Sequence, residues 1–523
     1  MSAGARQRRA AAMSLLLFAG LQSAPVHAQV APERSVGAPF VAPSADGLAA
    51  RQATRQATSH LTSRDAREAA SQALPPGLAR MAARLGVPAT GVSVWVQGIG
   101  DPAPRVAFNA DEPRNPASAL KLVTTFAALE GLGPAHTWTT EVYLGRPLGP
   151  GGETGDLWLR GGGDPYLVQE EYWKLIAALR NRGLARIEGD LLLDVSRFDL
   201  PTEDRGAFDG QPDRVYNVLP HPLLVNFNAA VFRVEARSDG TVAIGLDPPL
   251  RNVRVDNRVR TATGPCAGYQ MGVGIAVRDP TARDTAVLYG RFPAVCGQYE
   301  LSRSVLQPES YAWGLFSLYW QQQGGAFEGR WRVAELPPGL EPFYVHRSRP
   351  LGDLIRLVNK FSNNVMTRHF EYALAVQRFG APATPEKGQQ AILDVLRERG
   401  VDTVGLIIGN SAGLARETRI SARQLGAVLE AAWNSPWMAE YVSSLSLAGL
   451  DGTMRSRLRG SPAAGRVHVK TGRLNGVSAV AGYVDAASGQ RMMAVLMVNA
   501  PQAHQGPGEE LQNAFLDWVY RAH

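Results

Sequence analysis

The middle of the chain has a different residue pattern from both of its ends, and this contrast limits the folds that are open to it. Between about Trp138 and Val345, short runs typical of β-strands alternate with Gly, Pro and Asp, as in 189-GDLLLDV-195 and 242-VAIGLD-247. Many segments on either side are longer and have the period of an amphipathic helix. At 523 residues, the chain is also too long for one typical domain. We therefore expect an α+β domain that is formed by both ends of the chain and split by a β-rich inserted region.

The two ends predict one antiparallel sheet with helices around it. The alternating segment Gly91–Gln97 and the following segment Arg105–Asn109 predict a hairpin. Further strands are expected at Val404–Ile408, Gly465–Thr471, Gly476–Asp485 and Met492–Asn499. The expected helices are Ala117–Gly131, Leu351–Phe361, Asn363–Gln377, Lys387–Arg399, Ser421–Trp433 and Glu509–Arg521. We expect the first hairpin and the last strands to share a sheet.

The N-terminus predicts export. A basic start at Arg6–Arg9 precedes the apolar run Ala10–Leu21, and a small-x-small cleavage pattern ends at Ala28. We expect a signal peptide at 1–28, cleaved after Ala28, because the apolar run is shorter than the roughly 20 residues that a membrane span needs. The segment 29–72 is rich in Ala, Pro, Ser, Gln and Arg, which predicts a flexible linker.

The remaining chain is expected to divide into a discontinuous domain, 73–137 plus 347–523, and the inserted region 138–346. No later segment is apolar and long enough to predict an integral membrane span. The formal net charge is +7, and the loss of three arginines with 1–28 leaves 7 − 3 = +4. This mild excess suits a negatively charged surface such as the cell wall, but no basic run with interleaved aromatic residues indicates a nucleic-acid partner. The oligomeric state, including a homodimer, is left open.

The chain has two cysteines, Cys266 and Cys296, both in the inserted region. In an exported protein, a lone pair 30 residues apart predicts a disulfide more readily than a metal site, which needs more ligands. Two unpaired buried thiols are the alternative.

A serine and a lysine stand three residues apart in 115-NPASALKLVTTFAAL-129, so Ser118 and Lys121 share one face of the expected helix. A serine hydroxyl is a weak nucleophile until a neighbouring base takes its proton. Lysine can act as this base only if burial or a nearby cation lowers its pKa. The pair alone is also consistent with a helix-capping serine and a solvated lysine.

Two further motifs lie downstream. Ser362-Asn363-Asn364 opens an expected helix, and Lys470-Thr471-Gly472 ends an expected strand. The lysine and threonine could bind a carboxylate, while the glycine lets a substrate approach the backbone. Taken singly, the first motif is explained by helix capping and the second by a hairpin turn with an exposed lysine.

In this order, the three motifs resemble the signature set of penicillin-recognising serine enzymes. The first two serines are 362 − 118 = 244 residues apart, and β-rich sequence fills the gap. This resembles the D-alanyl-D-alanine carboxypeptidase/endopeptidases of the penicillin-binding-protein 4 type, peptidase family S13. The stretches 160-RGGGDP-165 and 447-LAGLDGTMRSRL-458 support the resemblance, which covers roughly Pro76 to the C-terminus. The stretch 409-GNSAGLAR-416 departs from the serine-glycine-leucine-serine run that is usual in the family.

The resemblance implies a serine β-lactamase/DD-peptidase-like fold, an antiparallel sheet flanked by helices. It implies that Ser118 is the nucleophile and Lys121 its base, and that Ser362 relays a proton to the leaving amine. Asn364 is expected to bind the amide backbone of the substrate. The implied activity is cleavage of D-Ala-D-Ala ends and D-Ala-diaminopimelate cross-links of peptidoglycan stem peptides in the periplasm.

The resemblance further implies that Lys470 keeps Lys121 neutral and, together with Thr471, binds the substrate carboxylate. The backbone N–H groups of Ser118 and Arg473, the residue after Gly472, are expected to form the oxyanion hole. β-Lactam antibiotics should acylate the nucleophile and leave slowly. No metal ion or organic cofactor is implied.

Three alternatives remain at the level of sequence. One is a β-lactamase or esterase on the same core, and another is a non-catalytic peptidoglycan-binding protein. The third is an α/β-hydrolase, because 409–413 fits G-x-S-x-G after an apolar segment, with Ser411 as nucleophile. Asp485 and His504 would complete its triad, although the elbow requires a helix that starts at the serine.

Overall fold

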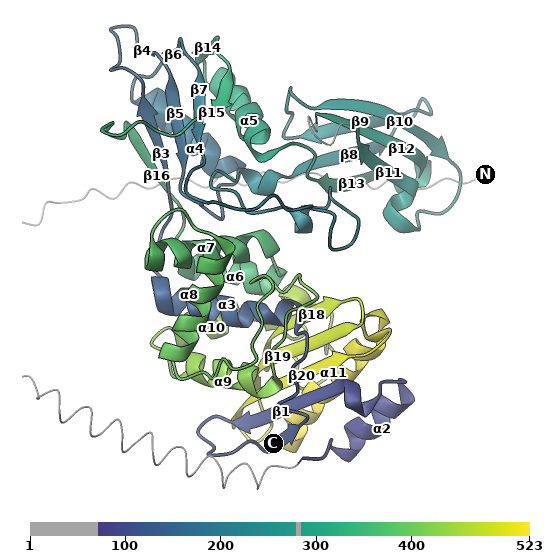
Figure 1. The fold of residues 1–523 in the computed structure, drawn as a ribbon. Coiled ribbons are helices and arrows are strands. Elements are labelled where there is room, and N and C mark those ends of the chain that lie inside the picture. Colours follow the sequence, from purple (N-terminus) through teal and green to yellow (C-terminus); the bar gives the residue numbers. More distant parts are fainter. Residues whose placement is uncertain (1–71, 279–283) are drawn as a thin grey trace, which may run out of the picture. The chain divides into compact units, whose positions relative to one another are not determined.

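The structure is a computed structural model that describes residues 72–278 and 284–523 (Figure 1). The predicted signal peptide and all but the last residue of the predicted linker lie outside the described residues. Within the described ranges, no helix is long and apolar enough to cross a membrane.

A six-stranded antiparallel sheet forms the centre of the domain that both ends of the chain build. Its strand order is β17-β18-β19-β20-β1-β2. The strands are β1 (Val92–Gly98), β2 (Val106–Phe108), β17 (Ser446–Leu447), β18 (Val467–Leu474), β19 (Val477–Asp485) and β20 (Arg491–Asn499). Strand β1 pairs with β20 along its whole length, from Val92 opposite Val498 to Gly98 opposite Met492. The prediction that the first hairpin and the last strands share a sheet is confirmed.

Both faces of this sheet are covered by helices, so β1, β19 and β20 are apolar on both sides. On one face, Trp95 and Val495 pack with the helices α3 (Lys121–Leu132), α6 (Leu351–Phe361), α7 (Asn364–Phe379), α8 (Pro385–Glu398), α9 (Ala422–Trp433) and α10 (Met438–Ser444). On the other, Val94 and Leu496 pack with α2 (Pro76–Arg84) and α11 (Pro507–Ala522). The α+β prediction is confirmed.

The inserted region contains four smaller sheets. A five-stranded sheet has the order β15-β7-β5-β3-β16, formed by β3 (Thr139–Leu144), β5 (Leu157–Gly161), β7 (Leu191–Asp194), β15 (Trp331–Val333) and β16 (Tyr344–Arg347). Beside it in sequence are β4 (Glu153–Thr154), β6 (Arg186–Ile187) and β14 (Ala326–Phe327), which pair in the order β14-β6-β4. Two helices, α4 (Gln169–Asn181) and α5 (Pro308–Gln322), also belong to this region, and the strand-based prediction did not include them.

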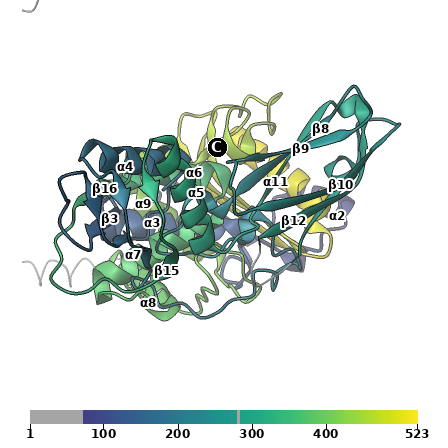
Figure 2. The same cartoon turned by 90° about the horizontal axis from the view of Figure 1, so that it is seen from above.

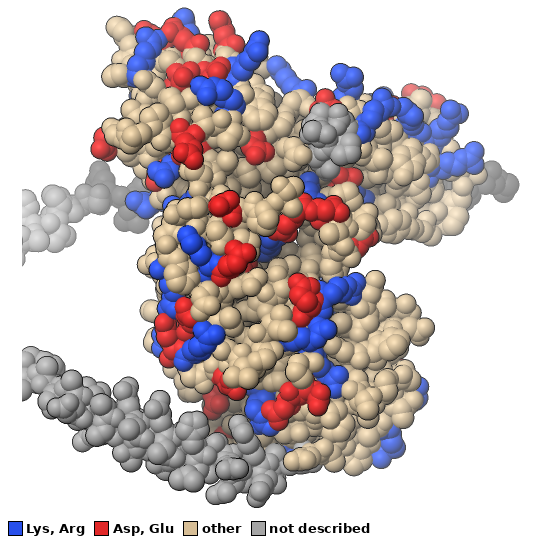
Figure 3. Space-filling view, in the orientation of Figure 1, with Lys and Arg blue, Asp and Glu red and all other residues tan. Residues whose placement is uncertain are grey.

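Two three-stranded sheets complete the insertion, and their strands gather together in Figures 1 and 2. One is formed by β8 (Ala230–Ala236), β9 (Val242–Asp247) and β13 (Gln298–Arg303), the other by β10 (Arg254–Ala262), β11 (Val273–Val277) and β12 (Thr285–Pro293). The predicted disulfide between Cys266 and Cys296 is confirmed, and it ties the loop after β10 to the turn after β12. Basic side chains gather over β9, β10 and β12 in Figure 3.

Most of the buried apolar residues of the insertion form a cluster separate from the two clusters that cover the six-stranded sheet, while Val218 and Leu224 pack with Val365 of α7. This separation supports the division into 73–137 plus 347–523 and 138–346, which stays a prediction.

One local prediction was wrong, and a second was right except for the type of its first helical turn. Residues Val404–Ile408 form no strand, because the chain turns at Gly405 with a positive φ of 73° and only Ile407 makes an isolated bridge, to Arg419. The helix expected from Ala117 begins as a 3-10 helix, η2 (Ala117–Leu120), and the α-helix starts at Lys121.

Candidate active site

The turn that carries Ser118 is held against the end of the central sheet. Asn115 and Asn499 exchange two hydrogen bonds, of 2.8 Å and 3.0 Å, which tie this turn to β20. The side chain of Asn115 also accepts a bond of 2.8 Å from the backbone N–H of Ala117. Ala117 has a φ of +47°, a conformation that an alanine keeps only when its surroundings hold it there. The serine hydroxyl is therefore presented by a constrained turn rather than by a flexible loop.

Lys121 lies one turn further on and is completely buried. Its Nζ is 3.0 Å from the Ser118 Oγ, 2.8 Å from the Asn364 Oδ1 and 2.6 Å from the backbone oxygen of Ala412. All three partners are neutral. Burial, and to a smaller extent the charge of Lys470, lowers the pKa of Lys121 well below the usual value for lysine. A neutral amine in this position can accept the proton of the serine.

Ser362 and Lys470 form a second pair on the opposite side of the site. The Lys470 Nζ is 3.0 Å from the Ser362 Oγ and 2.7 Å from the backbone oxygen of Thr471. Burial lowers the pKa of Lys470 to about 7. Ser362 has a left-handed φ of 59° between α6 and α7, and Asn363 caps α7 by accepting a bond from the N–H of Met366. Capping therefore explains the middle residue of the motif, while the serine faces the lysine.

Strand β18 passes directly beside the turn that carries Ser118. A Cβ on Gly472 would collide with the backbone oxygen of Pro116 and would lie 2.9 Å from the N–H nitrogen of Ser118. Only glycine allows this approach. Residues on a strand alternate between its faces, so Lys470 and Gly472 point toward α3, whereas Thr471 and Arg473 point the other way.

The edge of β18 is open next to Ser118. Strand β17 pairs only with His468 and Val469, so the residues that follow on β18 have no strand on that side. A groove of about 570 Å³ runs along this edge. Five of the predicted residues line it, namely Ser118, Ser362, Thr471, Gly472 and Arg473. Lys121 and Lys470 lie beneath the groove, where each bonds to a serine that lines it, Ser118 and Ser362 respectively.

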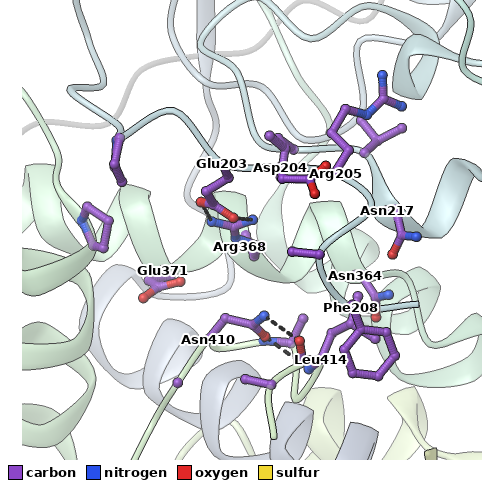
Figure 4. A pocket seen from close by; sticks show the side chains of 18 of the residues that line it. Glu203, Asp204, Arg205, Phe208, Asn217, Asn364, Arg368, Glu371, Asn410 and Leu414 are labelled. Atoms are coloured by element: carbon purple, nitrogen blue, oxygen red, sulfur yellow. Dashed lines mark hydrogen bonds and ion pairs between the residues drawn. The ribbon is translucent and has the colours of Figure 1, made fainter. Parts of the chain in front are cut away.

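A second cavity, of about 460 Å³, lies between α7, the loop 409–417 and the segment 201–219 of the insertion (Figure 4). Asn364 borders this cavity, and its Nδ2 donates a 3.0 Å bond to the backbone oxygen of Tyr216. Arg368, also on α7, pairs with Glu203 of the insertion at 2.5 Å. The insertion is thus in contact with the helix that opens with the second motif.

The loop 409–417 is fixed by hydrogen bonds to α7 and to α3. Ser411 is buried, and its Oγ donates a 2.6 Å bond to Glu371 on α7. The backbone oxygen of Ser411 accepts a 2.7 Å bond from Thr124 on α3. Burial raises the pKa of Glu371 to about 7. This loop holds the carbonyl of Ala412 that Lys121 contacts, and no motif in the sequence pointed to Glu371 or Thr124.

The arrangement at Ser411 does not fit the α/β-hydrolase alternative. No helix starts at this serine, and the hydroxyl faces Glu371 in the interior. His504 accepts a bond from the N–H of Gly476, and Asp485 pairs with Arg491. Among residues 72–278 and 284–523, no group of three or more His, Cys, Asp or Glu side chains could hold a metal ion.

Comparisons with known proteins show the family of the chain. A family model described as the D-Ala-D-Ala carboxypeptidase 3 (S13) family matches residues 78–519. The chain is 29% identical to a D-alanyl-D-alanine carboxypeptidase of Actinomadura sp. (strain R39), over 75% of this chain and 74% of that protein. It is 25% identical to the D-alanyl-D-alanine carboxypeptidase DacB of Haemophilus influenzae, over 73% of this chain and 80% of that protein.

The fold is similar to a solved structure as well. The crystal structure of penicillin-binding protein 4 (dacB) from Haemophilus influenzae superposes with a TM-score of 0.73 at 23% sequence identity. The match covers 86% of this chain and 100% of that chain.

Proposed function

Because the chain belongs to the D-Ala-D-Ala carboxypeptidase 3 (S13) family, we propose that it is a periplasmic serine DD-carboxypeptidase and DD-endopeptidase that cleaves peptidoglycan stem peptides. The observation that carries the proposal is the 3.0 Å contact between the Lys121 Nζ and the Ser118 Oγ, in a buried site where the other partners of the lysine are neutral. A lysine in this environment serves as a base rather than as an ion-pair partner.

In the first half-reaction, neutral Lys121 takes the proton of Ser118 while the Oγ attacks the carbonyl carbon of the penultimate D-alanine. The new C–O bond places negative charge on the carbonyl oxygen. The backbone N–H groups of Ser118 and Arg473 are proposed to stabilise this charge. The close approach of Gly472 to the Ser118 N–H supports this role, because it brings β18 beside the nucleophile.

Collapse of the intermediate breaks the C–N bond, and the leaving amine needs a proton. Ser362 is proposed to donate its hydroxyl proton to the amine and to be reprotonated with the proton that Lys121 took from Ser118, which returns Lys121 to its neutral form. The Ser362 Oγ is 3.0 Å from the Lys470 Nζ, which orients the hydroxyl. The acyl-enzyme remains on Ser118. A water molecule then gives a proton to Lys121 and attacks the ester carbonyl. The C–O bond to Ser118 breaks, the shortened peptide leaves, and Lys121 returns the proton to the Ser118 Oγ.

Substrate recognition is proposed to use the open edge of β18. Lys470 and Thr471 bind the carboxylate next to the scissile bond. Asn364 binds the amide backbone of the substrate, which requires the substrate to replace the contact between the Asn364 Nδ2 and Tyr216. A β-lactam has a similarly placed carboxylate, so it should acylate Ser118 and leave slowly.

Penicillin labelling followed by intact-mass measurement tests this proposal on the wild type and on Ser118→Ala. We expect one adduct on the wild type and none on the variant. An adduct on Ser118→Ala would contradict the assignment of the nucleophile. Rapid turnover of nitrocefin would favour a β-lactamase, and an adduct without D-alanine release from a pentapeptide would favour a binding protein. Digestion of cross-linked and uncross-linked muropeptides measures the two peptidase activities separately.

A further inference from the structure

The groove continues past the residues that the mechanism uses. From Thr471 and Arg473 it extends across the face of the sheet that α11 covers, toward the first turns of that helix. The residues that line this far part of the groove include Arg457, Ser478, Glu509, Gln512 and Asn513. None of them takes part in the acylation or deacylation steps described above.

Arg457 is the unusual residue of this part. It is only 8% exposed, and its Nε donates a 2.8 Å bond to the Asn513 Oδ1. Its Nη2 is buried and has no hydrogen-bond partner among the described residues. The nearest carboxylate given by the structure, that of Glu509, is 3.8 Å away and belongs to a side chain that is 54% exposed. A buried guanidinium with an unused donor is costly unless a ligand completes it.

The surroundings of Arg457 provide charges of both signs. Arg473 is exposed on the same side of β18 as Thr471 and lines the groove. Glu509 and Glu510 are exposed at the start of α11 and also line it. A groove with two guanidinium groups and two carboxylates fits a ligand that itself carries carboxylates and amines.

We propose that this part of the groove is a subsite for the leaving portion of cross-linked peptidoglycan, with Arg457 binding a carboxylate of the second stem peptide. The inference rests on the proposed function. When D-alanine is the leaving group, it brings one carboxylate, which Lys470 and Thr471 bind. A cross-linked substrate instead releases a whole second stem, which continues past the diaminopimelate residue to a further carboxylate at its end.

The proposal therefore separates the two peptidase activities. Arg457 contributes to cleavage of the cross-link and is not needed for release of D-alanine. The deciding experiment measures kcat/KM of the full-length enzyme on two substrates. One is a pentapeptide that ends in D-Ala-D-Ala. The other is a D-Ala-diaminopimelate cross-linked dimer whose acceptor stem ends in a free carboxylate.

For Arg457→Gln we expect kcat/KM on the dimer to fall about 10- to 100-fold, because the variant loses a charge-assisted hydrogen bond to the substrate. The value of kcat/KM on the pentapeptide should stay within about threefold of the wild-type value. Amidation of the terminal carboxylate of the dimer should lower the wild-type rate by a similar factor and leave the variant unaffected. Equal losses on both substrates, or an unchanged rate on the dimer, would overturn the proposal.

Two further variants keep the test decisive. Arg459 is an exposed arginine two residues away, outside the groove lining, so Arg459→Gln is the matched control and should change neither rate. Asn513→Asp puts a carboxylate next to the Arg457 Nε, so it should occupy the guanidinium and reproduce the selective loss without lowering the melting temperature. If Arg457→Gln does not fold, the rates of Asn513→Asp on the two substrates test the subsite proposal.

If the proposed function itself is wrong, the measurements differ from those expected when only the subsite is wrong. In that case the wild-type enzyme would release no D-alanine from the pentapeptide. Failure of the subsite alone would leave this activity intact and would show Asn513→Asp cleaving the dimer as fast as the wild type.

Discussion

Two sites in the same domain bury lysine side chains, and they do so in opposite ways. In the candidate active site, Lys121 and Lys470 are 0% exposed, and among the described residues their Nζ atoms bond only to hydroxyl, amide and carbonyl oxygens. At the end of α6, Lys360 is 6% exposed, and its Nζ lies 2.6 Å from a carboxylate oxygen of Asp451. Burial is nearly the same at the two sites. The two sites differ in the carboxylate, which makes Lys360 part of an ion pair, whereas burial without a carboxylate lowers the pKa of Lys121 and Lys470.

The largest expected effect comes from removing the base. Lys121→Met should lower the rate of penicillin acylation by about 10³-fold, because the serine proton then has no acceptor in the groove. Lys360→Met is the matched control, since it removes a lysine of similar burial whose contacts are structural. The rates are measured by quenched-flow intact-mass labelling. A similar loss in both variants would mean that burial of a lysine, rather than the contact with Ser118, carries the effect.

A carboxylate placed next to Lys121 should give this lysine an ion pair like that of Lys360. Asn364→Asp keeps the shape of the side chain and puts a negative charge 2.8 Å from the Lys121 Nζ. The pKa of Lys121 should rise, so acylation at pH 7 should fall by about 10²-fold and recover partly as the pH is raised. A pH profile that keeps its wild-type midpoint would show that the charge state of Lys121 does not limit acylation.

Breaking the ion pair of Lys360 should affect stability rather than chemistry. Asp451→Asn leaves the buried ammonium without its carboxylate. Because the Asp451 side chain is 38% exposed, we expect a loss of about 1–3 kcal/mol in the free energy of unfolding, less than for a fully buried pair. Urea denaturation measures this loss. The acylation rate of the folded variant should remain within about threefold of the wild-type rate, and a larger drop would indicate a link between this pair and the groove.

The last prediction concerns Lys470 and the dependence of stability on pH. Burial lowers the pKa of Lys470 to about 7, whereas an unfolded chain keeps the usual lysine value near 10.4. Between these two pH values the unfolded state binds more protons than the folded state. The free energy of unfolding therefore rises with pH by up to about 1.4 kcal/mol per pH unit. Below pH 7, the folded state carries the full cost of the buried charge. The free energy of unfolding of Lys470→Met should rise less steeply over this range, because only Lys121, whose pKa burial also lowers, then contributes to it. Parallel curves for the two proteins would contradict it.

Regular periodicity accounts for most of what could be predicted about the fold. The alternation in β1, β19 and β20 and the helical period of α6 and α9 placed these elements within a few residues of their observed bounds. Helix α4 was also readable, because its buried residues Tyr172, Leu175, Ile176 and Leu179 have helical spacing. It was missed because the surrounding region was interpreted by its strands. The prediction of a strand at Val404–Ile408 was wrong for a different reason, because a short apolar run does not determine whether the segment pairs with another strand.

Local sequence determined the residue types of the candidate active site and their spacing: Ser118 with Lys121, Ser362 with Asn364, and Lys470 with Gly472. These are short-range features, and a strand or a helical turn is enough to place each set on one face. Only the tertiary structure decided that the three segments meet. It also decided which lysine has a carboxylate and which has none, and that Arg457 borders the groove with an unused donor. Burial and electrostatic environment depend on contacts between residues hundreds of positions apart, and no local pattern records them.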